Sequence, residues 1–350
     1  MDIRNAATEQ AWDDFLRAQP WSPFLQSWTM GDVYADIGQQ VLRIEARDGD
    51  QILGVAFAHL VPARRGRHLS VPYGPVVDGG LQGTEREAVI RELLAKLKSE
   101  AKQLGCAFVR LSPFSEKEIL PGTVSSPLHL LAEHVWYLPL QTETGAPRNE
   151  EEILMQMRKT TRNLIRRAER DGVTVEASTN PENDLEHFLK LHEETRKRHG
   201  FTPYTDAFFR SQVRRFAAKK QCTVYLARFE GQVIAASVHM HAFGETSYHH
   251  GASSSAHHKI PSSYLLQWTA IRDALKRGDR IYNFWGIAPL DADGNVAGKL
   301  GKHPFGGVTL FKTGFGGTML NLTHCSDIPV NAKYWLTYAI ETVRKWKRGF

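Results

Sequence analysis

Lys312 is the residue with the clearest chemical potential in this sequence, because it lies in a run of phenylalanines and glycines. The run extends from Phe305 to Gly317, and the aromatic stretch Tyr282–Ile287 precedes it. A lysine fixed in such surroundings can stabilise a developing oxyanion or hold a carboxylate. The glycines would let the backbone approach an extended substrate closely. An ordinary lysine at the end of a strand fits the same residue types equally well.

A second candidate is a basic helix predicted over residues 150–170. Four arginines recur on it at intervals of four: Arg158, Arg162, Arg166 and Arg170. Guanidinium groups on one helix face repel each other unless an anion lies there, and their planar donor sets suit phosphate. The pattern predicts contact with a diphosphate or an RNA backbone. The alternative is a solvated face neutralised by acidic residues of the same helix.

Other kinds of site find less support. Histidines cluster from His239 to His258, but a metal needs three or four converging ligands, and carboxylates are sparse nearby. The basic segment Leu60–Arg67 lacks the second glycine and the following helix that a pyrophosphate loop needs, so we interpret it as a hairpin tip. No phosphate-binding loop motif and no serine-nucleophile elbow is present. We therefore predict no metal, no cofactor and no covalent nucleophile.

Composition sets the class of protein. The 350 residues include 44 Lys and Arg against 38 Asp and Glu, a formal charge of +6. This mild excess permits a polyanionic partner without requiring one. The three cysteines are scattered, which argues against a disulfide scaffold. The N-terminal residues are not apolar, and the longest apolar stretch, Ile52–Val61, is too short for a bilayer. We therefore expect a cytoplasmic protein.

The elements that must position these residues form one pattern used twice. The segment 46–56 matches 227–237 without a gap at an offset of 181 residues, and both predict a hairpin. Each copy continues with a strand, a helix and a further strand. These helices are predicted over 84–104 and 262–276 from apolar spacings of three and four. Two copies of one α/β domain with mixed sheets are therefore expected.

The remaining segments connect and extend the two copies. Residues 141–147 are polar and predict a linker. Asn180-Pro181 predicts the start of a helix that ends at His199, and Thr205 predicts the start of the next. A last helix is predicted over 331–348, with cations in its final turns, where they suit the helix dipole.

Taken together, these motifs resemble the Fem family of non-ribosomal aminoacyltransferases, which build the interpeptide bridges of peptidoglycan. The residues that carry the resemblance occur in order along nearly the whole chain: Tyr73-Gly74-Pro75-Val76; Met157-Arg158-Lys159-Thr160-Thr161-Arg162 with Ile165-Arg166-Arg167-Ala168; Phe188 through Arg198-His199-Gly200-Phe201; Tyr248-His249-His250-Gly251-Ala252-Ser253; Tyr282 to Ile287; and Phe311-Lys312 with Gly314-Phe315-Gly316-Gly317.

The resemblance implies a fold and assigns one substrate to each domain. The expected fold is α/β (α+β), with two tandem GNAT-like, or acetyltransferase-like, domains and a C-terminal helix that returns to the first. The first domain would comprise residues 1–146 plus 326–350 and bind the acceptor precursor. The second would comprise residues 147–325 and bind aminoacyl-tRNA.

The resemblance also implies a reaction. An amino acid passes from aminoacyl-tRNA to the stem-peptide amine of a lipid-linked or UDP-linked peptidoglycan precursor, a step in cell-wall biogenesis and cell shape. Lys312 is the expected catalytic residue, binding the donor carbonyl oxyanion or a nearby carboxylate. Aminolysis of an activated ester needs positioning and oxyanion stabilisation but no covalent step. The expected substrate-binding residues are Phe311, Tyr73, Arg158, Arg162, Arg166, Arg198, Tyr204, Tyr248, Trp285 and Phe305.

The expected partners are thus aminoacyl-tRNA and the precursor, with no DNA. Peripheral contact of the basic last helix with the inner face of the membrane is expected if the acceptor is lipid-linked. Two other functions remain open on the residues alone. One is an acyl-CoA-type N-acyltransferase on the GNAT fold, and the other is a non-catalytic relative that binds an anion or RNA.

Overall fold

The computed structural model divides the chain into two compact units. It describes residues 1–350 apart from 64–65, 200–203, 292–293, 295, 297–303 and 349–350. The first unit comprises Met1–Glu133 with Asn321–Phe350, and the second comprises His134–Leu320. These boundaries differ from those predicted at 146/147 and 325/326. The reason is that residues 134–139 and 318–321 form strands of the second sheet.

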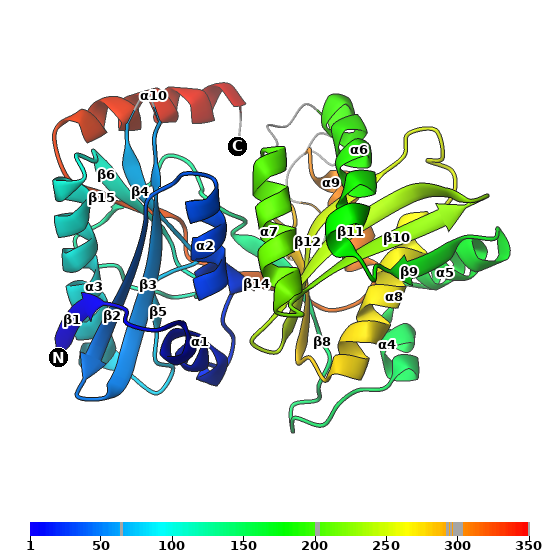
Figure 1. Ribbon diagram of the computed structural model, residues 1–350, viewed down its shortest axis with the longest axis horizontal. Coiled ribbons are helices and arrows are strands. Elements are labelled where there is room, and N and C mark those ends of the chain that lie inside the picture. The colour runs from blue at the N-terminus through cyan, green and yellow to red at the C-terminus, as the bar shows by residue number, and fades with distance from the viewer. Residues whose placement is uncertain (64–65, 200–203, 292–293, 295, 297–303, 349–350) are drawn as a thin grey trace. The chain divides into compact units, whose positions relative to one another are not determined.

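The first unit contains an eight-stranded mixed sheet in the order β1-β2-β3-β4-β6-β15-β7, with β5 paired to β3. Its strands are β1 (Asp2–Asn5), β2 (Val41–Asp48), β3 (Gln51–Val61), β4 (His68–Pro72), β5 (Val76–Val77), β6 (Phe108–Ser112), β7 (Val124–Ser125) and β15 (Ser326–Pro329). Its helices are α1 (Glu9–Ala18), the short η1 (Phe24–Gln26), α2 (Trp28–Asp36), α3 (Gly83–Gln103) and α10 (Lys333–Arg348). Figure 1 shows these elements in blue, cyan and red.

The second unit contains a seven-stranded mixed sheet in the order β14-β8-β13-β12-β11-β10-β9. Its strands are β8 (His134–Pro139), β9 (Thr174–Ala177), β10 (Cys222–Phe229), β11 (Gln232–Ala242), β12 (Glu245–Ser253), β13 (Ile281–Gly286) and β14 (Thr318–Asn321). Its helices are α4 (Glu150–Gln156), α5 (Lys159–Arg170), α6 (Pro181–His199), α7 (Asp206–Ala218), α8 (Ser262–Arg277) and α9 (Gly306–Thr313). The core of this unit gathers buried residues of α8, α5 and the sheet.

Equivalent irregularities recur in the two sheets and confirm the duplication. The hairpin β2–β3 shifts register between Ala46 and Arg47, and the hairpin β10–β11 shifts between Ala227 and Arg228, 181 residues further on. In each unit the strand after the hairpin pairs in parallel with the strand that follows the helix α3 or α8. These pairs are β4 with β6 and β12 with β13. β3 and β4 pair antiparallel, as the predicted hairpin requires, although residues 64–65 of its tip lie outside the described residues.

Each sheet also contains a strand that lies outside its own repeat in the sequence. β15, which follows the second unit, pairs antiparallel with β6 in the first sheet. β8, which follows the first repeat, pairs antiparallel with β13 in the second sheet. The C-terminal segment therefore returns to the first unit as predicted, and Tyr334 of α10 is fully buried against Phe108.

The predicted helix over 150–170 is two helices. α4 ends at Gln156, Met157 is extended with ψ 148°, and α5 begins at Lys159. No helix among the described residues is long and apolar enough to cross a membrane.

Candidate active site

Lys312 lies in the last turn of α9 with its ammonium group enclosed. Its side chain is only 7 % exposed, and Nζ donates a 2.6 Å hydrogen bond to the carbonyl of Gly286 at the end of β13. The ring of Tyr248 on β12 lies 5.9 Å from Nζ. Burial lowers the pKa of Lys312 to about 7, because a buried ammonium loses its hydration. The group therefore changes charge near neutral pH, and it lies on a helix, whereas the alternative interpretation makes it an ordinary lysine at a strand end.

A hydrogen-bonded chain beneath Tyr248 holds that ring in place. Tyr248 stacks on His239, whose Nε2 lies 2.8 Å from the hydroxyl of Tyr282. The Tyr282 hydroxyl donates to Gln267 Oε1 at 2.6 Å, so His239 Nε2 carries the proton and donates to Tyr282. Burial lowers the pKa of His239 to about 3, so the imidazole is neutral. The sequence indicated His239 only as a strand histidine, since nothing local identifies its partners.

Gly251 makes room for the Tyr248 side chain. A Cβ atom at position 251 would lie 1.8 Å from the Tyr248 hydroxyl oxygen, closer than any real contact. Tyr248 can therefore occupy its place beside Lys312 only if residue 251 is glycine. Burial also raises the pKa of Tyr248 to about 12, so the hydroxyl stays protonated.

An irregularity at the end of β13 presents the Gly286 carbonyl to Lys312. The register of β13 against β8 shifts between Asn283 and Trp285, and Trp285 has φ 68°. The Asn283 side chain stabilises this turn by accepting the Trp285 backbone N–H at 2.7 Å. Positive φ is costly for a bulky residue and often marks a functional site. The half-buried Trp285 ring packs edge-on against His249.

The glycines after Lys312 serve packing within the chain, which corrects their expected use against a substrate. A Cβ at Gly314 would lie 2.4 Å from Thr161 Oγ1 of α5, and one at Gly317 would lie 2.3 Å from the Tyr137 carbonyl oxygen of β8. A Cβ at Gly316 would meet the Gln156 backbone. These glycines allow α9 to dock against α4, α5 and β8.

Phe311 lies beside a cavity of about 720 Å³ in the same unit. The cavity is formed by Ser253, the segment 254–261 and the first turn of α8, together with Tyr264 and Phe311. The Phe311 ring packs edge-on against Tyr264, with centroids 4.9 Å apart. Phe305, at the start of α9, is 51 % exposed. The cavity therefore combines an aromatic wall with serine, histidine and lysine side chains.

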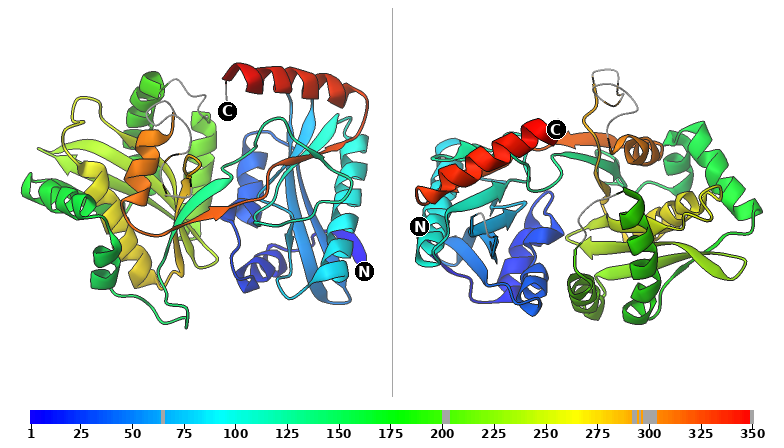
Figure 2. Two further views of the ribbon diagram at one scale, coloured as in Figure 1. Left: turned by 180° about the vertical axis from the view of Figure 1, so that it is seen from behind. Right: turned by 90° about the horizontal axis from the view of Figure 1, so that it is seen from above.

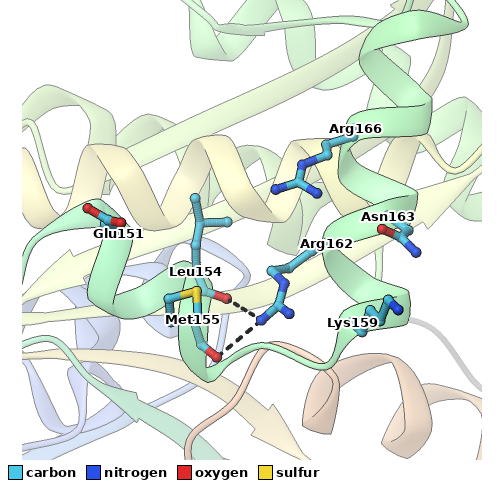
Figure 3. A pocket seen from close by; sticks show the side chains of 7 residues that line it. All are labelled: Glu151, Leu154, Met155, Lys159, Arg162, Asn163 and Arg166. Atoms are coloured by element: carbon cyan, nitrogen blue, oxygen red, sulfur yellow. Dashed lines mark hydrogen bonds between the residues drawn. The ribbon is translucent and has the colours of Figure 1, made fainter.

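Arg162 has a structural role through its Nη1 atom, and its interpretation as a phosphate ligand stays a prediction. Its Nη1 donates to the carbonyls of Leu154, Met155 and Met157 at 3.3, 3.1 and 2.9 Å. These carbonyls lie at the end of α4, where the last carbonyls of a helix lack i+4 donors, and the Leu154 carbonyl also accepts the Met157 backbone N–H at 3.1 Å. Figure 3 shows the guanidinium directed at two of them. The break between α4 and α5 thus brings Arg162 back onto the helix that precedes it.

The other arginines of this face remain exposed. Figure 3 shows Arg166, Lys159 and Arg162 along one side of a cavity of about 380 Å³, with Glu151 on the α4 side. Arg158 caps the start of α5, where its backbone N–H donates to Gly314. The cationic surface is therefore made by Lys159, Arg166 and Arg170 more than by Arg162.

Single substitutions should separate these roles. Arg162→Ala is expected to lower the free energy of unfolding by about 1–2 kcal/mol, because the carbonyls of Met155 and Met157 lose the guanidinium as a donor and that of Leu154 loses one of two donors. Arg166→Ala should change stability by less than about 0.5 kcal/mol but weaken the RNA binding that the arginine pattern predicts, and reduce the salt slope of that binding by about 1. Chemical denaturation and binding titrations at several salt concentrations measure both. If Arg162→Ala weakened binding without loss of stability, and Arg166→Ala did the reverse, Arg162 would be the phosphate ligand.

The remaining predicted residues are distributed more widely. Tyr73 lies in the first unit, fully buried, with its hydroxyl donating to the Ala132 carbonyl at 2.7 Å. This placement gives Tyr73 a packing role in the first unit, and its predicted substrate contact stays a prediction. Tyr204, just before α7, is 45 % exposed and stacks on Phe208. The side chain of Arg198 lies outside the described residues.

The buried histidines His241 and His249 of the second unit are packing groups, and burial lowers the pKa of both. Burial lowers the pKa of His249 to about 3, and His241 is hydrogen-bonded to Thr223 and Thr246. Among the residues that the structure describes, no group of three or more His, Cys, Asp or Glu side chains is placed to hold a metal ion.

Comparison with known proteins defines the class. Residues 155–293 match the family model described as an acetyltransferase (GNAT) domain. No curated protein sequence matches the chain. Among solved structures, FemX superposes with a TM-score of 0.79 at 18 % identity, over 97 % of this chain and 100 % of that one. The tandem GNAT fold expected from the resemblance to the Fem family is thereby confirmed.

Two further structures share the fold. The C-terminal domain of a putative lysylphosphatidylglycerol synthetase from Agrobacterium fabrum has a TM-score of 0.56 at 14 % identity, with 96 % of each chain covered. A tandem GNAT protein of the clavulanic acid biosynthesis pathway has a TM-score of 0.55 at 12 % identity, covering 94 % of this chain and 98 % of that one. The family match and the fold together support an acyltransferase of the GNAT fold.

Proposed function

We propose that this protein is a tRNA-dependent aminoacyltransferase that adds an amino acid to the stem-peptide amine of a peptidoglycan precursor. The observation that carries the proposal is the enclosed ammonium group of Lys312, in a chain whose fold extends over the whole of FemX. An enclosed cation suits a reaction in which negative charge develops on a carbonyl oxygen.

The reaction joins the acceptor amine to the aminoacyl carbonyl carbon and breaks the ester bond to the ribose. The amine loses a proton, and the departing ribose hydroxyl gains one. Lys312 binds the carbonyl oxygen and stabilises its charge in the tetrahedral intermediate. No enzyme-bound acyl group is required, since the donor ester is already activated and the site supplies proximity.

The second unit would hold the donor. In this proposal Phe311, Phe305 and Tyr248 contact the aminoacyl end, and the cavity before α8 accepts the end of the nucleic acid. Arg158, Arg166 and Arg198 contact phosphates, and Trp285 and Tyr204 complete the binding surface. The first unit would bind the precursor, whether lipid-linked or UDP-linked. The reaction would take place in the cytoplasm, with the protein peripheral to the inner face of the membrane when the acceptor is lipid-linked.

An acyl-CoA-dependent N-acyltransferase is the second candidate. The family match to an acetyltransferase domain and the fold shared with a tandem GNAT protein described as without AcCoA favour it. Against it, the segment 254–261 before α8 contains no glycine. Backbone amides at a helix start approach a pyrophosphate most closely through glycines, so this segment fits a polar side-chain contact better.

A transfer assay distinguishes the two candidates. Total tRNA charged with radiolabelled amino acids is incubated with the protein and either a nucleotide-linked or a lipid-linked precursor. We expect label on one precursor, and its loss after RNase treatment. Transfer from acetyl-CoA, with no labelling from tRNA by a folded protein, would favour the second candidate.

The charge of Lys312 predicts how donor binding depends on pH. Because its pKa is about 7, the ammonium is present at pH 6 and mostly lost at pH 8.5. Affinity for an amide-linked aminoacyl minihelix should therefore weaken by about tenfold per pH unit above 7. In Lys312→Met the affinity should show no change of slope near pH 7. Tighter binding of the natural protein as the pH rises would contradict a cationic role.

A further inference from the structure

We propose that α10 is a membrane-docking helix that inserts its exposed apolar stripe into an anionic lipid bilayer. This inference goes beyond the transfer reaction and does not rest on it, because lipid binding can be measured without donor or acceptor. It assigns a surface and a chemical partner to a helix whose buried side has a separate structural role.

The stripe contains four large apolar side chains that the fold leaves in solvent. They are Trp335 (55 % exposed), Leu336 (68 %), Val343 (51 %) and Trp346 (83 %). At 100° per residue these positions fall within an arc of about 100°, over about 17 Å of helix. Soluble proteins rarely expose such continuous apolar surface without a use.

The opposite side of α10 is the one that packs on the first unit. Tyr334 is fully buried, Thr337 is 5 % exposed, and Glu341 pairs with Arg110 of β6. Figure 2 shows α10, in red, running along one side of that unit. The stripe therefore faces away from the surface on which the helix is already held, and docking requires no unfolding.

Basic residues flank the stripe on α10, and their charge favours an anionic membrane as the partner. Lys333, Arg344, Lys345 and Lys347 are all exposed, and Glu341, the sole acid of the helix, points inward to its ion pair. Basic residues beside an apolar stripe with tryptophans are the pattern of a helix that lies in the interface of an anionic membrane. Long lysine and arginine side chains can reach the headgroups while the stripe is buried.

A second copy of the chain fits this surface less well. Two copies that paired through the stripe would bring two sets of cations together, and the helix has no exposed acid to neutralise them. Each basic residue near an anionic leaflet instead contributes about fivefold to binding. Charge complementarity thus favours lipid.

Vesicle co-sedimentation of the whole protein tests the proposal. Vesicles of phosphatidylglycerol and phosphatidylcholine should retain the protein at low salt, and pure phosphatidylcholine should retain it at least tenfold less. Leu336→Ser with Trp346→Ser should reduce binding to anionic vesicles about tenfold or more, and Lys345→Glu with Lys347→Glu should do the same. Matched controls are Ile119→Ser, an exposed apolar residue elsewhere, and Lys98→Glu on α3.

Three outcomes would overturn the inference. The first is that the natural protein does not bind anionic vesicles. The second is that both double variants bind as well as the controls, so that another surface makes the contact. The third is concentration-dependent dimerisation that Leu336→Ser with Trp346→Ser abolishes, which would make the stripe an interface between copies. Unfolding curves of the variants confirm that each remains folded.

Discussion

Replacing Lys312 with alanine is expected to reduce aminoacyl transfer by about 10²- to 10³-fold while the protein stays folded. This is the usual effect of removing one group that stabilises an oxyanion in an enclosed site. The assay is the RNase-sensitive transfer of labelled amino acid, followed as kcat/KM for the donor. Lys98→Ala on the exposed face of α3 is the control. Full activity in Lys312→Ala would remove the proposed mechanism.

Lys312 should also lower the free energy of unfolding. The direction of the pH dependence follows from its lowered pKa. The folded-state pKa is about 7 and the ordinary value is 10.5, so between these pH values the unfolded chain binds the additional proton. Stability of the natural protein therefore rises with pH across this window. Below pH 7 the folded protein bears the full cost of a buried cation. Lys312→Met should then be more stable by about 1–3 kcal/mol at pH 6, and this advantage should fade towards pH 10.

Denaturant unfolding at pH 6, 8 and 9.5 measures this difference. A variant that is inactive yet more stable at low pH would indicate that the lysine is held for chemistry rather than for packing. Equal stability of Lys312→Met and the natural protein at all three pH values would show that the ammonium is better solvated than its surroundings indicate.

The second large effect is expected at Asp327, which ties the C-terminal segment to the first unit. Its two carboxylate oxygens each accept a 2.8 Å hydrogen bond from Arg110, and Tyr334 donates to one of them at 3.2 Å. Arg110 also donates to Glu341 of α10. Asp327 is fully buried and Arg110 is nearly so. Asp327→Ala should therefore destabilise the first unit by about 3–5 kcal/mol, because it leaves a buried guanidinium with half of its partners.

Limited proteolysis and thermal unfolding report this loss. The C-terminal segment should be cleaved faster in Asp327→Ala, since β15 and α10 depend on this ion cluster. Glu87→Ala, which breaks the exposed pair with Arg91, is the control and should change stability by less than about 1 kcal/mol. If Asp327→Ala behaved like this control, the cluster would contribute nothing to holding the segment.

Local patterns in the sequence determined most elements of each unit. The stripe Val89, Leu93 and Leu97 predicted α3 because a helix returns to one face every three to four residues, and all three are buried. Thr205 caps α7 as predicted, since its side chain accepts the Phe208 N–H. The repeat at an offset of 181 predicted two similar sheets. These features depend on neighbours within a few residues, so the sequence displays them directly.

Tertiary structure alone decided which distant groups meet. The pairing of β8 with β13 and of β15 with β6 depends on hydrogen bonds between segments more than 100 residues apart, which no periodicity encodes. The same holds for Arg162, whose guanidinium turns back to α4 only because the helix breaks at Met157.

For the candidate site, too, the sequence indicated some features and the tertiary structure decided the others. The residue types around Lys312 indicated a reactive lysine, because a cation among aromatics and glycines is unusual in sequence. Its enclosure, its bond to Gly286 and its lowered pKa come from packing α9 against the end of β13. The glycines beside it turned out to fit neighbouring backbone, since space around a residue is a property of the folded chain. Sequence indicated the candidate residue, and the fold supplies the environment that would make it reactive.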